Sequence, residues 1–329
     1  MRVAVVGCGL IGAKRARALV ESRLVASVDR DLARAEGLAA AHEGCAAGTD
    51  WEAAVGRKDV DLVIVATTND ALTPVALAAV RHGRHVLLEK PAARSAEELR
   101  PLVAAAREAG VLVKVGFNHR FHPAVAKAHE IFAAGGVGPL LYLRGRYGHG
   151  GRLGYEREWR ADRAVAGGGE LIDQGVHLID LARWFLGDFE EVQGFAQTYF
   201  WDMPAEDNGF LLLRTPKRQV AFLHASWTEW KNLFSFEICG LTGKLEMMGL
   251  GGSYGLERLT YYRMLPGMGP PETTIWEYPM PDTSWEQEFA EFVEDIRLGR
   301  QPGAGLTDAK AALQVVERVY EGRARDHHT

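Results

Sequence analysis

Short apolar runs recur along the first third of the chain, and each is followed by a stretch that favours a helix. The runs are rich in valine, isoleucine and leucine and lie at 2–6, 24–28, 61–66, 85–88 and 111–115. Such runs are typical of strands that are buried on both faces of a parallel sheet. Strands that alternate with helical stretches predict an α/β domain with a doubly wound parallel sheet over residues 1–121.

The pattern changes after residue 121. Helices are expected at 124–134 and 169–186, with a strand between them at 140–147. Alternating apolar and polar positions then predict strands with short turns at 192–200, 209–214, 219–227, 233–239 and 244–248. Residues 249–271 show no clear pattern, and two helices, 285–298 and 307–320, are expected before a loose tail at 323–329. Residues 122–329 are therefore expected to form a second α/β domain with a large, mostly antiparallel open sheet.

The turn after the first apolar run has the spacing of a dinucleotide-binding fingerprint. It reads Gly7-Cys8-Gly9-Leu10-Ile11-Gly12. In this motif the first glycine permits a tight turn, the second lets the backbone approach a pyrophosphate, and the third lets the helix close onto the strand. The alternative is a glycine turn that binds another anion or nothing. The flanking strand and helix favour a Rossmann domain that binds a dinucleotide.

The choice of dinucleotide depends on the end of the second apolar run. Asp29 stands about twenty residues after the glycines, where an acid accepts hydrogen bonds from the adenosine ribose. Its charge favours NAD, because it would repel a ribose phosphate. Arg30 keeps NADP open, since an arginine there could bind that phosphate.

Polar residues also follow other predicted strands at their carboxyl ends, which is the edge where parallel sheets bind ligands. They lie at 67–69, 89–90 and 116–120. The expected cofactor contacts are Gly7, Gly9, Leu10, Ile11, Gly12, Asp29, Arg30, Thr67, Thr68, Asn69, Glu89, Lys90 and Asn118.

The helix expected at 169–186 carries Asp173 and His177 four residues apart, on one face. A carboxylate beside an imidazole can orient the ring and raise its basicity, which suits proton transfer near neutral pH. Taken alone, such a pair more often caps a neighbouring element. Lys90, at the rim of the parallel sheet, favours chemistry instead, because alcohol oxidation needs a base for the hydroxyl proton and a positive charge for the alkoxide.

Together, three motifs in this order resemble those of the Gfo/Idh/MocA oxidoreductases, over nearly the whole chain. They are the glycine turn, Glu89-Lys90-Pro91, and Gly167-Gly168-Gly169 followed by Asp173 and His177. The resemblance implies that Lys90, Asp173 and His177 are the catalytic trio, with His177 as the proton donor or acceptor. It also implies a C-terminal domain whose open sheet often serves as an oligomer interface. The chain departs from the family at Leu72, where many members carry a histidine.

Other side chains are expected to contact the substrate together with the trio. The expected contacts are Lys90, Arg120, Tyr147, Trp159, Arg160, Asp173 and His177, and Asn118, His149, Arg152, Tyr155 and Arg163 lie on the same segments. The family often has the Trp159-Arg160 pair beside the substrate. The arginines between 144 and 163 are compatible with a phosphate or carboxylate on the substrate, although arginine-rich loops are also simply well solvated.

Composition narrows the class of protein. The 329 residues are 47% hydrophobic and 25% charged, which is ordinary for a folded protein of two domains. A net charge of −5 argues against a nucleic-acid partner. Cys8, Cys45 and Cys239 are odd in number and widely spaced, so neither disulfides nor a metal site are expected. The first strand leaves no room for a signal peptide and no apolar run could span a bilayer, so we expect a cytoplasmic protein without a membrane partner.

The combined prediction is an NAD(P)-dependent dehydrogenase or reductase. It would act on a secondary alcohol or ketone of a sugar, polyol or sugar derivative, nucleotide sugars included. It would form a homodimer or homotetramer through the C-terminal sheet. Two alternatives stay open: a nicotinamide-dependent regulatory sensor without turnover, and a redox-neutral enzyme with tightly bound NAD.

Overall fold

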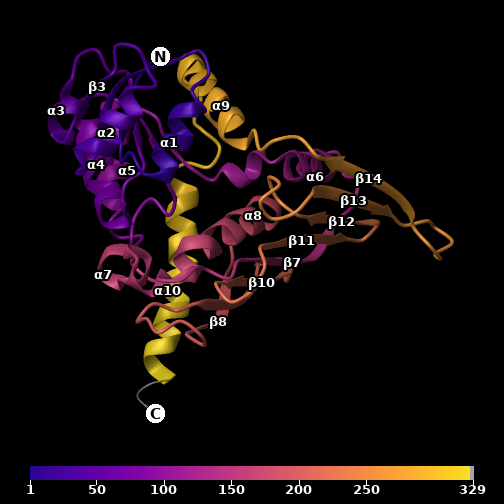
Figure 1. Ribbon diagram of the computed structural model, residues 1–329. Helices are drawn as coiled ribbons and strands as arrows, with labels where there is room; N and C mark the ends of the chain where they lie inside the picture. Colours follow the sequence, from indigo (N-terminus) through magenta and orange to yellow (C-terminus); the bar gives the residue numbers. More distant parts are fainter. Residues whose placement is uncertain (327–329) are drawn as a thin grey trace. The chain divides into compact units, whose positions relative to one another are not determined.

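The apolar runs of the first third form a six-stranded parallel sheet in the computed structural model, which describes the backbone of residues 1–326 and the side chains to residue 322 (Figure 1). The strand order is β3-β2-β1-β4-β5-β6, and every neighbouring pair is parallel. The strands are β1 Arg2–Val6, β2 Arg23–Val28, β3 Ala46–Gly48, β4 Leu62–Val65, β5 His85–Leu88 and β6 Val113–Val115. The predicted doubly wound parallel sheet is confirmed.

Helices connect these strands and cover the sheet. They are α1 Leu10–Arg17, α2 Leu32–Ala39, α3 Trp51–Gly56, α4 Asn69–Arg81 and α5 Arg100–Ala109. Aspartates cap two of them: Asp31 accepts a hydrogen bond from Ala33 N at the start of α2, and Asp50 accepts one from Ala53 N at the start of α3. These caps satisfy backbone groups that a helix start otherwise leaves without a partner.

A late helix joins this first unit of the chain. The unit comprises residues 1–117, 164–167 and 285–313, and the second unit comprises 118–163, 168–284 and 314–329. Helix α9, Ser284–Leu298, packs Phe289, Phe292 and Val293 into the same core as Val3 and Val5 of β1. These two units are made of several chain segments each, and the predicted domain boundary between residues 121 and 122 stays a prediction.

The second unit contains an eight-stranded sheet in the order β14-β13-β12-β11-β7-β10-β9-β8. All neighbouring pairs are antiparallel except β7 and β10, which confirms the mostly antiparallel sheet. The strands are β7 Leu140–Gly148, β8 Glu191–Gln197, β9 Asn208–Arg214, β10 Val220–Ser226, β11 Leu233–Gly240, β12 Gly243–Met248, β13 Glu257–Arg263 and β14 Glu272–Tyr278.

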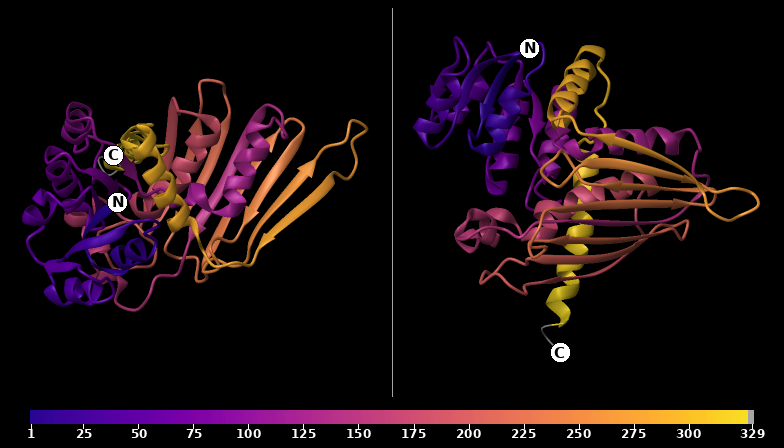
Figure 2. Two further views of the ribbon diagram at one scale, coloured as in Figure 1. Left: turned by 90° about the horizontal axis from the view of Figure 1, so that it is seen from above. Right: turned by 45° about the vertical axis from the view of Figure 1, so that its right-hand side comes forward.

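Two helices lie on one face of this sheet (Figure 2). Helix α6, Pro123–Ala133, packs on β12, β13 and β14, whereas α8, Val176–Leu186, packs on β7 and β10. The expected helix at 169–186 starts instead with a π turn at Leu171–Gly175, and α8 follows it directly.

Short helical turns and one long helix complete the chain. The short turns are η1 Asn118–Phe121, η2 Tyr155–Arg157, η3 Trp159–Ala161 and α7 Arg163–Ala166. Helix α10 spans Leu306–Asp326, so the expected tail at 323–329 is helical to Asp326, and 327–329 lie outside the described residues.

Candidate functional site

The glycine turn after β1 leaves space at one glycine and none at the other two. Gly7 has φ +94°, and a Cβ there would lie 2.4 Å from the Ala66 carbonyl oxygen. A Cβ at Gly12 would lie 1.8 Å from the Gly7 carbonyl oxygen, so α1 closes directly onto the turn. At Gly9 no heavy atom of the described chain lies within 4 Å of the Cβ position. This open position at the start of α1 fits a ligand that approaches the backbone, as a pyrophosphate does.

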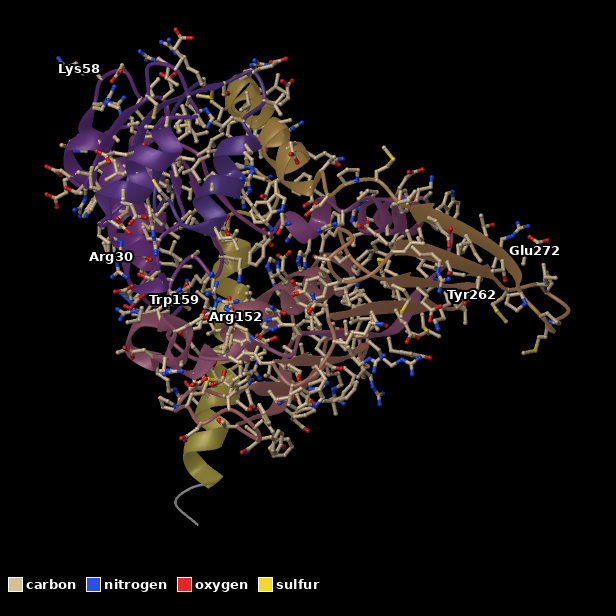
Figure 3. All side chains as sticks on the ribbon, viewed as in Figure 1. Arg30, Lys58, Arg152, Trp159, Tyr262 and Glu272 are labelled. Carbon is tan, nitrogen blue, oxygen red and sulfur yellow. The ribbon has the colours of Figure 1, made fainter. Side chains whose placement is uncertain are left out.

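Asp29 organises the same turn. Its Oδ2 accepts a hydrogen bond from Cys8 N at 2.7 Å, and its Oδ1 accepts one from Asp31 N at 2.9 Å. Each carboxylate oxygen keeps a second lone pair, so the group can still accept from a ribose hydroxyl. Arg30 beside it is exposed (Figure 3).

Cys8 is a packing residue of the turn. Burial, together with the Asp29 charge, raises the pKa of the Cys8 thiol to about 12. The thiol is therefore protonated at neutral pH and lacks the thiolate needed for nucleophilic chemistry.

Glu89 belongs to a buried ion cluster. Arg15 of α1 is fully buried and donates from Nε to Glu89 Oε1 at 2.6 Å, and it also pairs with Glu288 of α9. Its guanidinium lies 4.3 Å from the centre of the Trp285 ring. A Cβ at Gly116 would lie 2.5 Å from this guanidinium, so a larger residue there would displace the buried ion pair. The expected cofactor residue Glu89 thus ties the end of β5 to two helices, a role that the sequence did not indicate.

The loop after β4 is used largely for packing. The Thr68 hydroxyl donates to Asp70 Oδ1 at 2.6 Å, and the buried Asn69 donates from Nδ2 to the Ala166 carbonyl oxygen at 2.8 Å. Leu72, where many family members carry a histidine, is fully buried in α4. The loop Thr67–Asn69 does lie at the carboxyl end of β4, as expected.

Lys90 lies at the carboxyl end of β5, at the same edge of the sheet as Asp29. The backbone of Glu89 still pairs with Val65 of β4, and Lys90 follows it, half-buried, with a cis peptide bond to Pro91. The expectation that this lysine stands at the sheet's rim is met within the first unit.

In the second unit, Asp173 is held by an arginine. The side chain lies in the π turn, and its Oδ2 accepts a hydrogen bond from Arg160 Nε at 3.0 Å. The Arg160 guanidinium lies over the Trp159 ring, 4.6 Å from its centre. Although burial acts in the opposite direction, the Asp173 charge raises the pKa of Arg160. The structure thus brings together Asp173 and Arg160, two of the residues expected at the substrate.

His177 is buried in α8 and stacks on a second histidine. Its ring centre lies 3.8 Å from that of His119, with 16° between the ring planes. Tyr147 meets His119 edge-on at 5.0 Å, and burial raises the pKa of Tyr147 well above its ordinary value. The sequence prediction did not single out His119, although it lies in the segment 116–120 that was expected at the rim.

Arg120 and Asn118 have structural partners in this unit. Arg120 forms two hydrogen bonds with Asp180 of α8, at 2.8 and 2.5 Å, and both side chains are buried. Asn118 donates from Nδ2 to Ser284 Oγ at 2.9 Å. The pair with Asp180 ties Arg120 to α8, and the substrate contact of Arg120 stays a prediction.

Several arginines of the segment 144–163 have partners within the second unit. Arg144 forms an ion pair with Glu237, and Arg152 forms one with Glu158 at the surface (Figure 3). The Arg163 guanidinium lies over the Tyr320 ring at 5.7 Å. Exposed ion pairs of this kind contribute little energy, so the arginines can still bind an anion, and a phosphate or carboxylate on the substrate stays a prediction.

Two aromatic residues of this loop are largely buried. Tyr155 packs against Trp227, and the His149 Nδ1 accepts a hydrogen bond from Gly151 N at 2.9 Å. Burial lowers the pKa of His149. The imidazole is therefore mostly neutral at neutral pH.

Neither a metal-ligand cluster nor a membrane-spanning helix is present in the described part of the chain. Among those residues there is no group of three or more histidine, cysteine, aspartate or glutamate side chains that could hold a metal ion. None of the helices within residues 1–326 is long and apolar enough to cross a membrane.

Comparisons with known proteins place both halves of the chain. Residues 1–117 match the family model described as an oxidoreductase family with an NAD-binding Rossmann fold, and residues 125–246 match the GFO/IDH/MocA C-terminal domain. Levoglucosan dehydrogenase from Pseudarthrobacter phenanthrenivorans is 32% identical over 163 residues, which are 49% of this chain and 42% of that protein. The dTDP-3,4-didehydro-2,6-dideoxy-alpha-D-glucose 3-reductase of Streptomyces violaceoruber is 28% identical and covers 99% of this chain and 96% of that enzyme.

A solved structure has the same fold throughout. The complex of levoglucosan dehydrogenase with NADH and L-sorbose superposes with a TM-score of 0.88, at 22% identity, over 99% of this chain and 97% of that chain. The chain spans between 42% and 60% of the length of the first four curated relatives that it matches. The family and the fold expected from the motifs are confirmed: the chain belongs to the Gfo/Idh/MocA oxidoreductases.

Proposed function

We propose that this protein is an NAD-dependent oxidoreductase that acts on a secondary alcohol or ketone of a sugar, polyol or sugar derivative. The observation that carries the proposal is the glycine turn. Gly7 and Gly12 have no room for a side chain, whereas Gly9 faces open space at the start of α1. The relatives support the substrate class, because they are named as dehydrogenases and reductases of levoglucosan, inositol and a deoxysugar nucleotide.

The residues that would hold the cofactor lie along one edge of the parallel sheet. The backbone amides at the start of α1 would bind the pyrophosphate, since Gly9 contributes no side-chain cap there. Asp29 would accept hydrogen bonds from the adenosine ribose, and its charge favours NAD over NADP. When bound, the nicotinamide supplies the hydride acceptor or donor.

The chain's own groups would handle the proton and the developing charge. In the oxidative direction, His177 would accept the substrate hydroxyl proton on a ring nitrogen, and the Lys90 ammonium would stabilise the alkoxide. Asp173 would hold a substrate hydroxyl, and Arg160 would keep that carboxylate charged and oriented. The family motifs support this assignment.

A panel of sugars, inositols and nucleotide sugars tests the function. Each compound is mixed with enzyme and NAD or NADP, and formation of the reduced cofactor is followed by absorbance. We expect reduction of NAD with at least one sugar or polyol. No reduction with any compound, in either direction, would contradict the proposal. Product formation without added cofactor would instead identify a redox-neutral enzyme.

We also propose that a second copy of this chain packs on the face of the eight-stranded sheet opposite α6 and α8. Three large apolar side chains are exposed on neighbouring strands there, Phe195 of β8, Leu212 of β9 and Phe222 of β10, and Leu212 lies directly opposite Phe222. An apolar patch on a flat sheet suits a two-fold symmetric contact.

Sedimentation tests this interface. Phe222→Asp should convert an oligomer into monomers, whereas Leu153→Asp, at a fully exposed loop position, should not. Monomers in the native protein, or an unchanged oligomer in the Phe222 variant, would rule the interface out.

The state of the three cysteines supports a location in the cytoplasm. Cys8, Cys45 and Cys239 are all free, which supports a cytoplasmic protein because cysteines stay reduced in that compartment. Cell fractionation that recovers the protein outside the cytoplasm would contradict this.

A further inference from the structure

The stack of His119 on His177 is a feature of the second unit that the proposed function does not use. His119 lies in η1 and His177 in α8, so the contact joins two elements that are far apart in the chain. The ring centres are 3.8 Å apart and the planes nearly parallel, at 16°. Both side chains are about 95% buried, with 4% and 5% of their surface exposed. The His177 ring is therefore held flat against a partner that is itself titratable.

Aromatic neighbours fix the His119 ring from other sides. Tyr147 of β7 meets it edge-on at 5.0 Å, Phe234 of β11 at 6.0 Å, and His122 at 5.6 Å. Because these neighbours pack around its edges, the His119 ring cannot turn, and the same face stays against His177. It can act as a rigid platform for that ring.

Titratable and charged side chains lie near the stacked rings. His122 Nδ1 lies 3.1 Å from Glu257 Oε2 and 3.9 Å from Asp282 Oδ1. Tyr147 is a neutral phenol near neutral pH, and it also lies edge-on to His177 at 6.2 Å. The titratable neighbours of the stack include the neutral phenol of Tyr147 and the imidazole of His122, which is paired with carboxylates. The charges of Glu170 and Asp173 also act on Tyr147 and raise its pKa.

We propose that His119 is a positioning residue for His177: it orients the ring by stacking on it and competes with it for a single proton. The proposal rests on the proposed function, in which His177 exchanges a proton with the substrate. Two positive charges at this separation in a buried site repel strongly, so the pair takes up one proton well before a second. His177 therefore accepts the substrate's proton while the pair holds none, and the two stacked rings then share that proton.

Carbon-13 labelling of the histidine rings tests the shared proton without any substrate. In the native protein we expect the His177 signal to titrate in two separated steps, because the two rings share the first proton. In His119→Phe the flat face is kept and the competing site is lost. The His177 signal should then titrate in one step, and its protonation should be complete at a pH about one unit higher.

Control variants make the titration specific. His129 also stacks on an aromatic ring, that of Trp184, at 3.8 Å and 3°. His129→Phe should leave the His177 titration unchanged. Identical titration of His177 in the native protein and in His119→Phe would overturn the shared proton.

Kinetics test the positioning. His119→Ala removes the platform and should lower kcat about tenfold or more with little change in KM, whereas His119→Phe should recover most of kcat at the pH optimum. Equal kcat in the native enzyme and His119→Ala, or equal losses in both variants, would overturn the positioning role.

The two failures are distinguishable. If the native protein turns over no compound of the panel but His177 titrates in two steps, the proposed function is wrong and the inference about the histidine pair stands. If the protein turns over a sugar but His177 titrates identically in the native protein and in His119→Phe, only the inference about the histidine pair is wrong.

Discussion

Replacing Gly9 by alanine should weaken cofactor binding while leaving the fold intact. Gly9 has φ −70° and ψ −165°, which alanine adopts without strain, and no heavy atom of the described chain lies within 4 Å of the added Cβ. A glycine-to-alanine change at a compatible site alters stability by about 0.4–1 kcal/mol, through the unfolded chain. The free energy of unfolding of Gly9→Ala should therefore lie within about 1 kcal/mol of the native value.

Cofactor binding should respond quite differently. The methyl group would occupy the space through which the backbone approaches the pyrophosphate. We expect the Kd for NADH to rise at least about tenfold, which corresponds to about 1.4 kcal/mol. Urea unfolding measures the stability, and titration of NADH fluorescence measures the affinity.

Two other glycines provide controls. Gly37 in α2 also has no heavy atom of the described chain within 4 Å, so Gly37→Ala should leave NADH binding unchanged and stabilise the helix by about 0.5–1 kcal/mol. Gly12→Ala would place a Cβ 1.8 Å from a carbonyl oxygen and should destabilise the fold by about 1–3 kcal/mol or more. NADH binding of native strength in Gly9→Ala would refute the assignment of the glycine turn. A loss of stability as large as that of Gly12→Ala would refute the open space at Gly9.

Three further variants test the cofactor preference and the buried charges. Asp29→Ser should raise the ratio of kcat/KM for NADP to that for NAD about tenfold or more; an unchanged ratio would show that Asp29 does not select the cofactor. Hydrogen bonds from His122 and from two backbone amides lower the pKa of Glu257 even though burial acts to raise it. A lowered folded-state pKa stabilises the protein above the ordinary value of 4.5 and loses this effect as the pH falls through the folded pKa. Glu257→Gln should therefore lower the urea midpoint more at pH 7 than in acid, and equal losses would contradict this. Arg15→Met leaves Glu288 buried without its partner and should cost about 3–5 kcal/mol in urea unfolding, against less than about 1 kcal/mol for Arg34→Met at an exposed pair; similar costs for both would count against the buried cluster.

Local patterns were sufficient to predict most of the fold. The β-branched runs of the first unit are buried on both faces, which is the environment that such runs indicate. Strand β14, with the sequence Glu-Thr-Thr-Ile-Trp-Glu-Tyr, was missed because five of its seven side chains are exposed and the alternating pattern is limited to the partly buried Trp276 and Tyr278. The sequence also could not show that α9 belongs to the first unit. Its apolar stripe shows that it is buried, but does not identify the sheet that it covers.

In the candidate site, too, local patterns could be predicted from sequence. The tight positions at Gly7 and Gly12, the open one at Gly9 and the place of Asp29 beside the turn could be predicted from sequence, because the motif has a fixed spacing and each position has its own steric or polar requirement.

Contacts between distant residues could not be predicted in this way. Arg15 resembles a surface residue of a helix, and only the fold brings Glu288 to it across 273 positions. Arg120 has the positive charge expected of a substrate ligand, and only the fold shows that it pairs with Asp180. His119 becomes a candidate residue only because the fold stacks it on His177. The type of a residue indicates which chemistry it can perform, but its partners in the fold cannot be predicted from its type.

The most direct test of the central claim compares chemistry with cofactor binding in Lys90→Ala and His177→Ala. With the sugar or polyol that reduces NAD fastest, kcat of each variant should fall by about 100-fold to 10,000-fold, since each removes a proton-transfer or charge-stabilising group. The Kd for NADH should stay within about threefold of the native value, and Lys127→Ala, which removes a surface ion pair, should match the native enzyme in both. Near-native kcat in both Lys90→Ala and His177→Ala would contradict the account.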